Sequence, residues 1–185
     1  FTAGAVFIPI STAYVCGNRS GVVAERILDP VEAIAGQLPP GAPRPKEFVV
    51  AEEIERLRDQ CRSVDADWEA QVRRRGWAPE SEEARTMRKR ALIAAGMRRA
   101  RSLGWNDIYT YTKFLGEQLI KQHQGEVPVV IIRTAIIESS LRDPEPGWLN
   151  DLRVADPLIV GFGKGRLMDF PANRRIVLDL IPADL

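Results

Sequence analysis

Tyr109 and Lys113 are two residues whose types and spacing could do chemistry together. Residues four apart on an α-helix share a face, one turn from each other. A nearby ammonium favours the phenolate form and lowers the pKa of a tyrosine from its usual value of about 10. Such a tyrosine is a better proton donor or acceptor near neutral pH. The pair is therefore a candidate acid–base site, with two surface residues of one helix as the alternative.

Ser11 and Thr12 form a second candidate site, because they follow an apolar run that predicts a strand from about Val6 to Ser11. Parallel α/β sheets bind ligands at the C-terminal ends of their strands. A hydroxyl at this position could donate a hydrogen bond to a carbonyl oxygen as that oxygen gains charge. The alternative is a plain strand-to-loop turn, which serine and threonine also favour.

The helix that must position Tyr109 and Lys113 is predicted to run to about Gln124. Asn106 or Asp107 could cap its start, and Gly125 could end it. Leu115 and Leu119 should point to the core, and Gly116 should allow a sheet to approach closely.

The run from Val127 to Arg133 is nearly all β-branched, which is typical of a strand buried on both faces. A strand, a long excursion, a helix and a strand make a βαβ arrangement with a right-handed crossover. The fold class predicted is therefore α/β, as the second half of a doubly wound parallel sheet.

A helical hairpin is predicted as an insertion between about residues 47 and 103. Apolar residues recur every three or four positions in its first helix, the segment 76–79 breaks it, and acidic residues open its second helix. Its arginines and lysines are either a solvated face or a surface that meets phosphates of a coenzyme or a membrane. The basic residues concerned are Arg73, Arg74, Arg75, Arg88, Lys89, Arg90, Arg98, Arg99 and Arg101.

Length and charge narrow the class of protein. A chain of 185 residues suggests one domain, and Lys+Arg 26 against Asp+Glu 25 argues against a nucleic-acid partner. The single histidine, His123, and the separate cysteines Cys16 and Cys61 predict neither a metal site nor a disulfide. A reducing, cytoplasmic setting is expected, and no apolar run is long enough to span a bilayer.

The hydroxyl pair, Tyr109-x-x-x-Lys113 and the strand 127–133 resemble the extended short-chain dehydrogenase/reductases. The resemblance is closest to the fatty acyl-CoA reductases of the male-sterility type, and the long insert is similar to their bacterial, alcohol-forming branch. It covers nearly the whole chain from Ile10 onward. Four motifs carry it: GWNDIYTYTKFLGEQLI at 104–120, IIESSLRDPEPGW at 136–148, ADPLIVGFGKGRLMDFP at 155–171 and LDLIPADL at 178–185.

The resemblance implies an NADPH-dependent reduction of a fatty acyl-CoA thioester to a fatty aldehyde, a fatty alcohol, or both. Tyr109 would protonate the carbonyl oxygen, and Lys113 would lower its pKa and hold the nicotinamide ribose. Thr12, favoured over its neighbour Ser11, would hydrogen-bond the same oxygen. Four further residues would pass beside the nicotinamide: Thr134, Ala135, Ile136 and Ile137.

The same resemblance implies a domain layout. Residues 1–140 would form the second half of a Rossmann-like NADP-binding domain, and residues 141–185 would begin a substrate-binding region. Apolar residues of that region could contact the acyl chain, with core packing as the alternative for each. They are Trp148, Leu152, Leu158, Ile159 and Phe162.

Two features depart from the family pattern. Thr134 stands where the family usually has proline, and no glycine-rich phosphate loop follows a first strand; the segment 161–165 lacks the Rossmann spacing. We therefore expect a truncated chain that binds NADPH poorly and is inactive by itself. The alternatives are another extended short-chain reductase or epimerase, acting on a carrier-bound thioester, sterol or nucleotide sugar, and a non-catalytic fragment. Peripheral contact with a membrane stays open.

Overall fold

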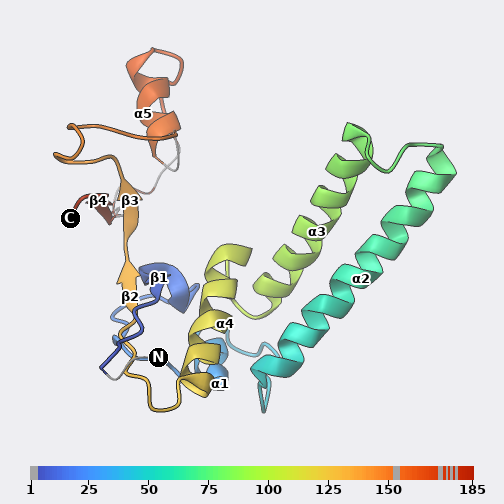
Figure 1. Cartoon of the computed structure of the whole chain (residues 1–185), viewed down its shortest axis with the longest axis horizontal. Coiled ribbons are helices and arrows are strands. Elements are labelled where there is room, and N and C mark those ends of the chain that lie inside the picture. The colour runs from blue at the N-terminus through green and yellow to red at the C-terminus, as the bar shows by residue number, and fades with distance from the viewer. Residues whose placement is uncertain (1–3, 152–154, 171–172, 174, 176, 178) are drawn as a thin grey trace. The chain divides into compact units, whose positions relative to one another are not determined.

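The computed structural model describes residues 4–151, 155–170, 173, 175, 177 and 179–185, which form two compact units, Phe1–Ile131 and Ile132–Leu185. Figure 1 shows the elements of each unit. The first contains β1 (Ile10–Thr12), the 3₁₀ helix η1 (Ala13–Cys16), α1 (Pro30–Ala35), α2 (Val50–Arg75), α3 (Glu82–Ser102) and α4 (Ile108–His123). The second contains β2 (Ile132–Thr134), β3 (Ile136–Glu138), α5 (Asp156–Gly163) and β4 (Leu180–Pro182).

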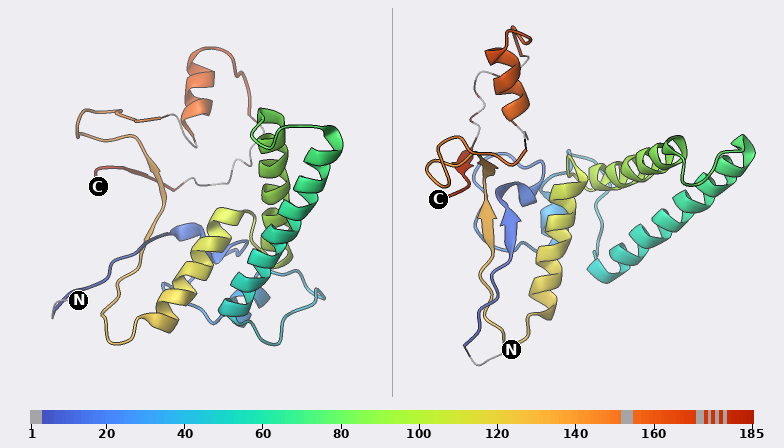
Figure 2. Two further views of the ribbon diagram at one scale, coloured as in Figure 1. Left: turned by 45° about the vertical axis from the view of Figure 1, so that its right-hand side comes forward. Right: turned by 45° about the horizontal axis from the view of Figure 1, so that its top comes forward.

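The predicted helical hairpin is present as α2 and α3, which lie side by side in both views of Figure 2. Gly76 ends α2 in the left-handed region at φ 65°, and the Ser81 hydroxyl accepts from the Ala84 amide to cap α3. The two helices are joined by side chains as well. Trp68 donates its indole N–H to the Ala84 carbonyl at 2.8 Å, and Arg88 binds both oxygens of Asp65 at 2.8 Å.

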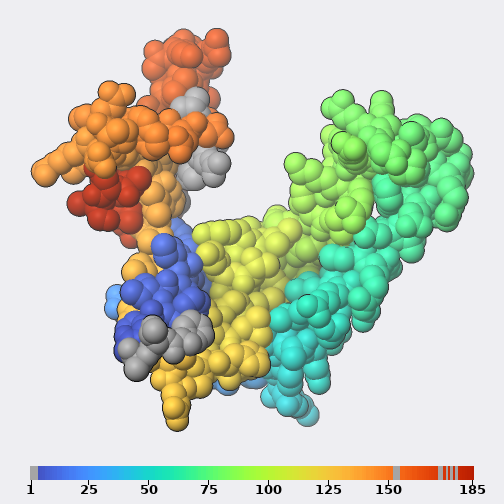
Figure 3. All heavy atoms as spheres, viewed as in Figure 1, coloured from blue at the N-terminus to red at the C-terminus, as the bar shows by residue number. Residues whose placement is uncertain are grey.

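The core of the first unit lies where α4 meets the hairpin and η1. Trp105 is fully buried, and its ring lies 4.5 Å from that of Phe114 and 5.3 Å from that of Tyr111. Its indole N–H donates to the Val15 carbonyl at 3.0 Å, which joins the start of α4 to η1. In the space-filling view of Figure 3, α4 lies between the N-terminal segment and the hairpin.

The expected approach to Gly116 is wrong, because an added Cβ there would meet nothing within 4 Å. The close approach is at Gly96 of α3, where an added Cβ would lie 2.8 Å from Cδ1 of Ile108. Leu115 is buried as predicted, and Leu119 packs against the core. The missing side chain on α3 therefore lets the first residue of α4 pack against the hairpin.

The strand predicted at 127–133 is only partly formed. Its last two residues, Ile132 and Arg133, belong to β2, and before them, within the described residues, only Val129 pairs, in a parallel bridge with Phe7. The Phe7 amide donates to the Pro128 carbonyl at 2.9 Å, and the Val130 amide donates to the Phe7 carbonyl at 3.0 Å. Val130 is 54% exposed, so burial on both faces is wrong for this segment. A β-branched run favours extended backbone whether or not a second layer covers it.

The second unit is built on the parallel pair β3 and β4, in which Ile136 pairs with Leu180 and Ile137 with Ile181. The Asp184 carboxylate, just after β4, accepts hydrogen bonds from the amides of Leu141, Arg142 and Asp143. This carboxylate therefore holds the loop that follows β3.

Helix α5 ends within the glycine-rich segment 161–165, so these glycines close a helix and do not open one. Two of the residues predicted to contact an acyl chain, Ile159 and Phe162 of α5, are exposed to solvent in the described part of the second unit. Neither packs in a core there. Trp148 is also partly exposed, and Leu152 lies outside the described residues. None of the helices in the described ranges combines the length and the apolar content needed to cross a membrane.

Candidate active site

The start of α4 is defined by a side-chain cap. The Asp107 carboxylate accepts from the Thr110 amide at 2.7 Å, which confirms Asp107 as the cap and begins the helix at Ile108. The helix ends at His123, followed by Gly125 at φ 56°. Tyr109 therefore lies in the first turn of α4.

Tyr109 and Lys113 share one exposed face of α4. The Tyr109 side chain is 59% exposed, and Lys113 Nζ lies 5.7 Å from the centre of its ring. The same ammonium donates a hydrogen bond to the Ile10 carbonyl at 2.8 Å. This contact ties the face of α4 that carries the pair to β1, the strand that contains Ser11 and Thr12.

Ser11 and Thr12 are both buried, in different hydrogen-bonding situations. The Thr12 hydroxyl oxygen accepts from the Tyr14 amide at 3.3 Å and so caps η1. This hydroxyl donates no hydrogen bond to the described residues, and a hydroxyl can donate as well as accept. Ser11 Oγ is buried without a hydrogen-bond partner in the part of the chain that the structure describes. Adjacent residues of a strand point to opposite faces, so the Ser11 and Thr12 hydroxyls lie on different faces of β1.

The other predicted cofactor residues lie in the second unit. Thr134 is the last residue of β2, Ala135 follows it, and Ile136 and Ile137 begin β3. Their role beside a nicotinamide stays a prediction.

A buried polar network on the opposite face of α4 was missed by sequence reasoning. Tyr111 is 1% exposed and donates its hydroxyl to Glu53 Oε1 at 2.7 Å. Arg99 binds both oxygens of Glu53, with Nε 2.7 Å from Oε1. Burial and then the bond to Glu53 raise the pKa of Tyr111, and the bond to Glu53 raises that of Arg99. A signal did exist, because Glu53 lies on the apolar stripe of α2, between Val50 and Ile54.

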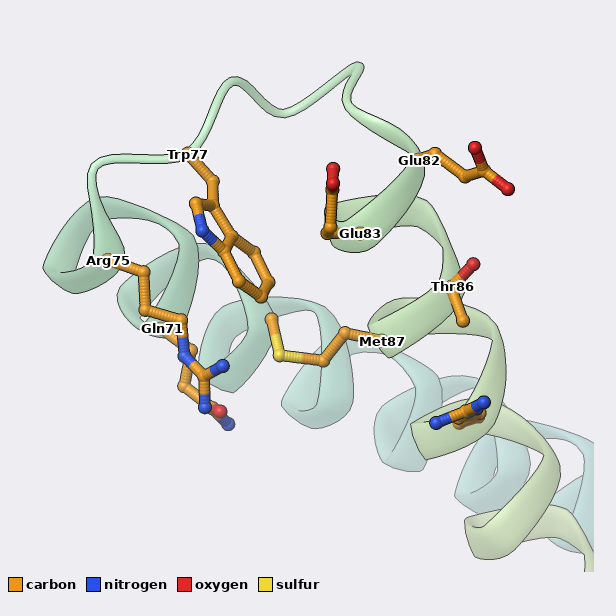
Figure 4. Close-up of a pocket in the computed structure, with 8 residues that line it drawn as sticks. Gln71, Arg75, Trp77, Glu82, Glu83, Thr86 and Met87 are labelled. Atoms are coloured by element: carbon orange, nitrogen blue, oxygen red, sulfur yellow. The ribbon is translucent and has the colours of Figure 1, made fainter.

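Several of the basic residues of the hairpin are engaged within it. Arg88 pairs with Asp65, and the Arg75 guanidinium lies 4.8 Å from the centre of the Trp77 ring. A hollow of about 600 Å³ lies at this end of the hairpin, and Figure 4 shows Trp77 pointing into it toward Met87. The described residues contain no group of three side chains suited to hold a metal ion.

Comparison with known proteins identifies the family to which the chain belongs. The model of a family of NAD-binding domains, described as male sterility protein, matches residues 2–185. Over 184 residues the chain is 36% identical to the chloroplastic fatty acyl-CoA reductase 2 of Arabidopsis thaliana, covering 97% of this chain and 26% of that protein. It is 33% identical over 180 residues to the alcohol-forming fatty acyl-CoA reductase of Simmondsia chinensis, covering 97% of this chain and 32% of that protein.

A relative from Bos taurus, fatty acyl-CoA reductase 2, is 42% identical over 80 residues, which is 43% of this chain and 16% of the relative. The chain is an α/β protein with short parallel strands, and it belongs to the male sterility protein family. It spans roughly a third or less of the length of these curated relatives.

Proposed function

We propose that this chain carries the proton-donating part of an NADPH-dependent reductase that converts fatty acyl-CoA to a fatty aldehyde, a fatty alcohol, or both. The observation that carries the proposal is the Lys113 ammonium, which lies beside the Tyr109 ring and is bound to the backbone of the hydroxyl-bearing strand. Residues 1–140 would belong to a Rossmann-like domain, and residues 141–185 to the region that binds the acyl group.

The side chains near Tyr109 have the capacity to bind a nicotinamide ribose. An ammonium has three hydrogens to donate, and the Ile10 carbonyl takes one of them. Lys113 therefore keeps two donors for ribose hydroxyls. A bound NADPH would supply the hydride. Thr134, Ala135, Ile136 and Ile137, which lie in the second unit, stay predicted nicotinamide residues.

The proton chemistry belongs to the chain itself. Tyr109 donates its phenolic proton to the thioester carbonyl oxygen as that oxygen gains charge, and the Lys113 ammonium stabilises the phenolate left behind. A hydroxyl from Thr12 or Ser11 donates a hydrogen bond to the same oxygen. The C–S bond of the reduced adduct then breaks and releases the coenzyme A thiol and an aldehyde. A second reduction of the aldehyde would give the alcohol.

The test is an assay of the full-length protein with NADPH or NADH and palmitoyl-CoA, with a nucleotide sugar as the competing substrate class. Cofactor oxidation is followed by absorbance, and products are identified by gas chromatography. We expect oxidation with palmitoyl-CoA and NADPH only. Turnover of the nucleotide sugar instead would assign the chain to a different short-chain reductase, and no turnover with a folded protein would support the non-catalytic alternative.

Variants test the assigned residues. Tyr109→Phe should lower kcat by about 10²–10⁴-fold, the range typical of a lost general acid, while the thermal shift given by NADPH stays the same. Lys113→Met should lower both activity and cofactor binding. Lys121→Met is its matched control, because this exposed lysine lies two turns further along α4. Equal effects of the two lysine variants would contradict the role of Lys113. Ser11→Ala and Thr12→Val identify which hydroxyl acts.

The bacterial branch and a cytoplasmic location, with or without contact to a membrane surface, stay predictions. The plant relatives include one described as chloroplastic.

A further inference from the structure

Three helices of the first unit meet at one buried carboxylate. Glu53, in the first turn of α2, is 3% exposed. It accepts two hydrogen bonds from Arg99 near the end of α3 and one from Tyr111 of α4. Arg56 adds an ion pair from the solvent side, with its Nε 3.4 Å from Glu53 Oε2. The carboxylate is therefore bound by donors from the hairpin and from α4 at once.

The Glu53 carboxylate depends on all of its hydrogen-bond partners, because it is buried. Removing one partner from a buried, charge-paired group leaves the other charge uncompensated. Displacing α4 by even part of a turn would take the Tyr111 hydroxyl out of reach of Glu53. On the apolar side of the network, the Trp105 ring packs against the Tyr111 ring.

Tyr111 and Tyr109 are linked through the geometry of α4. Residues two positions apart in an α-helix are separated by about 200° around its axis, so the two phenols point to nearly opposite sides. One is 59% exposed beside Lys113, and the other is 1% exposed against Glu53. Both lie in the first turn and a half of α4, so the position of one sets the position of the other.

We propose that Tyr111 is a positioning residue: through Glu53 and Arg99 it uses the long helical insertion to set the position of Tyr109 toward the substrate. This proposal rests on the proposed function of Tyr109. It gives the insertion a role in the active-site framework. A change far from the reacting atoms that misplaces a catalytic group by about 1 Å can lower a rate by about a hundredfold. The network can therefore control kcat without touching substrate.

The test is Tyr111→Phe in the full-length protein, which keeps the ring and removes the hydroxyl. We expect kcat with palmitoyl-CoA to fall about tenfold, with the KM for palmitoyl-CoA and for NADPH within about twofold of the unchanged protein. Hydrogen exchange at the amides of residues 108–114 should speed up by about tenfold, because α4 loses one of its anchors.

Arg88→Gln is the matched control. Arg88 also joins α3 to α2, through two hydrogen bonds to the Asp65 carboxylate. Within the described part of the chain, neither residue of this pair bonds to α4. The control should leave kcat and the exchange of residues 108–114 unchanged, which separates positioning of Tyr109 from general loosening of the hairpin.

The outcomes are distinct. A folded Tyr111→Phe protein with unchanged kcat and unchanged exchange overturns the proposal, as does an equal effect of Arg88→Gln. If Tyr111→Phe does not fold, Arg99→Gln weakens the same network while keeping the Tyr111 hydroxyl, and the same readouts decide. If the unchanged protein reduces no acyl-CoA, the proposed function fails, whereas the exchange measurement still decides whether Tyr111 and Glu53 hold α4.

Discussion

The two faces of α4 carry the same side-chain type in opposite environments. Tyr109 is exposed beside Lys113, whereas Tyr111 is enclosed by Trp105, Glu53 and the hairpin. Burial and the bond to Glu53 raise the pKa of Tyr111 and hold its proton, which makes it a poor acid and a good anchor. On α4, therefore, the properties of a tyrosine follow from its neighbours on each face and not from its residue type alone.

The largest expected difference between the two faces is in stability. Trp105→Ala should lower the free energy of unfolding by about 3–5 kcal/mol, because it removes a fully buried ring and its bond to the Val15 carbonyl. Tyr109→Phe, on the exposed face, should change it by less than about 0.5 kcal/mol. Urea unfolding monitored by circular dichroism measures both. Similar losses for the two variants would contradict the division into a buried side that stabilises the fold and an exposed side that contributes little to stability.

A smaller effect on the free energy of unfolding is expected from the Tyr111 hydroxyl at high pH. The folded-state pKa of Tyr111 is raised above its unfolded value of about 10, so its contribution to stability is fully present below pH 10. Above pH 10 the unfolded chain releases this proton first, and stability falls as the pH rises. Unfolding measured from pH 9 to 11 should show a shallower decline for Tyr111→Phe than for the unchanged protein. Parallel declines would rule out Tyr111 as the source.

The smallest effect on stability is expected from an exposed carboxylate of the second unit. Asp184 has its pKa lowered to about 2, first by the bond from the Leu141 amide and then by that from Asp143. Its contribution is present above the ordinary pKa of about 4 and is lost as the pH falls from there toward 2. A carbon-detected NMR titration should give the low value. Asp184→Asn should speed amide exchange at residues 141–143 and leave α4 unchanged; faster exchange in α4 would show that the effect is not local.

Local patterns predicted the helices well. The spacing of apolar residues and the break at 76–79 predicted the hairpin, and Asp107 and Gly125 marked the ends of α4. These signals act over one or two turns, where capping bonds and side-chain periodicity dominate. Strands were predicted less well, because the pairing of Phe7 with Val129 joins segments that are far apart in the chain.

By itself, the sequence determined which residues could do chemistry: the spacing of Tyr109 and Lys113 puts them on one helix face, and the helix follows from its caps and apolar side. Only the tertiary structure decided what each tyrosine of α4 faces. The meeting of Glu53, Arg99 and Tyr111 joins residues 46 and 58 positions apart, and the Lys113 bond to Ile10 spans 103. Such contacts depend on how whole helices pack, and no local propensity encodes them.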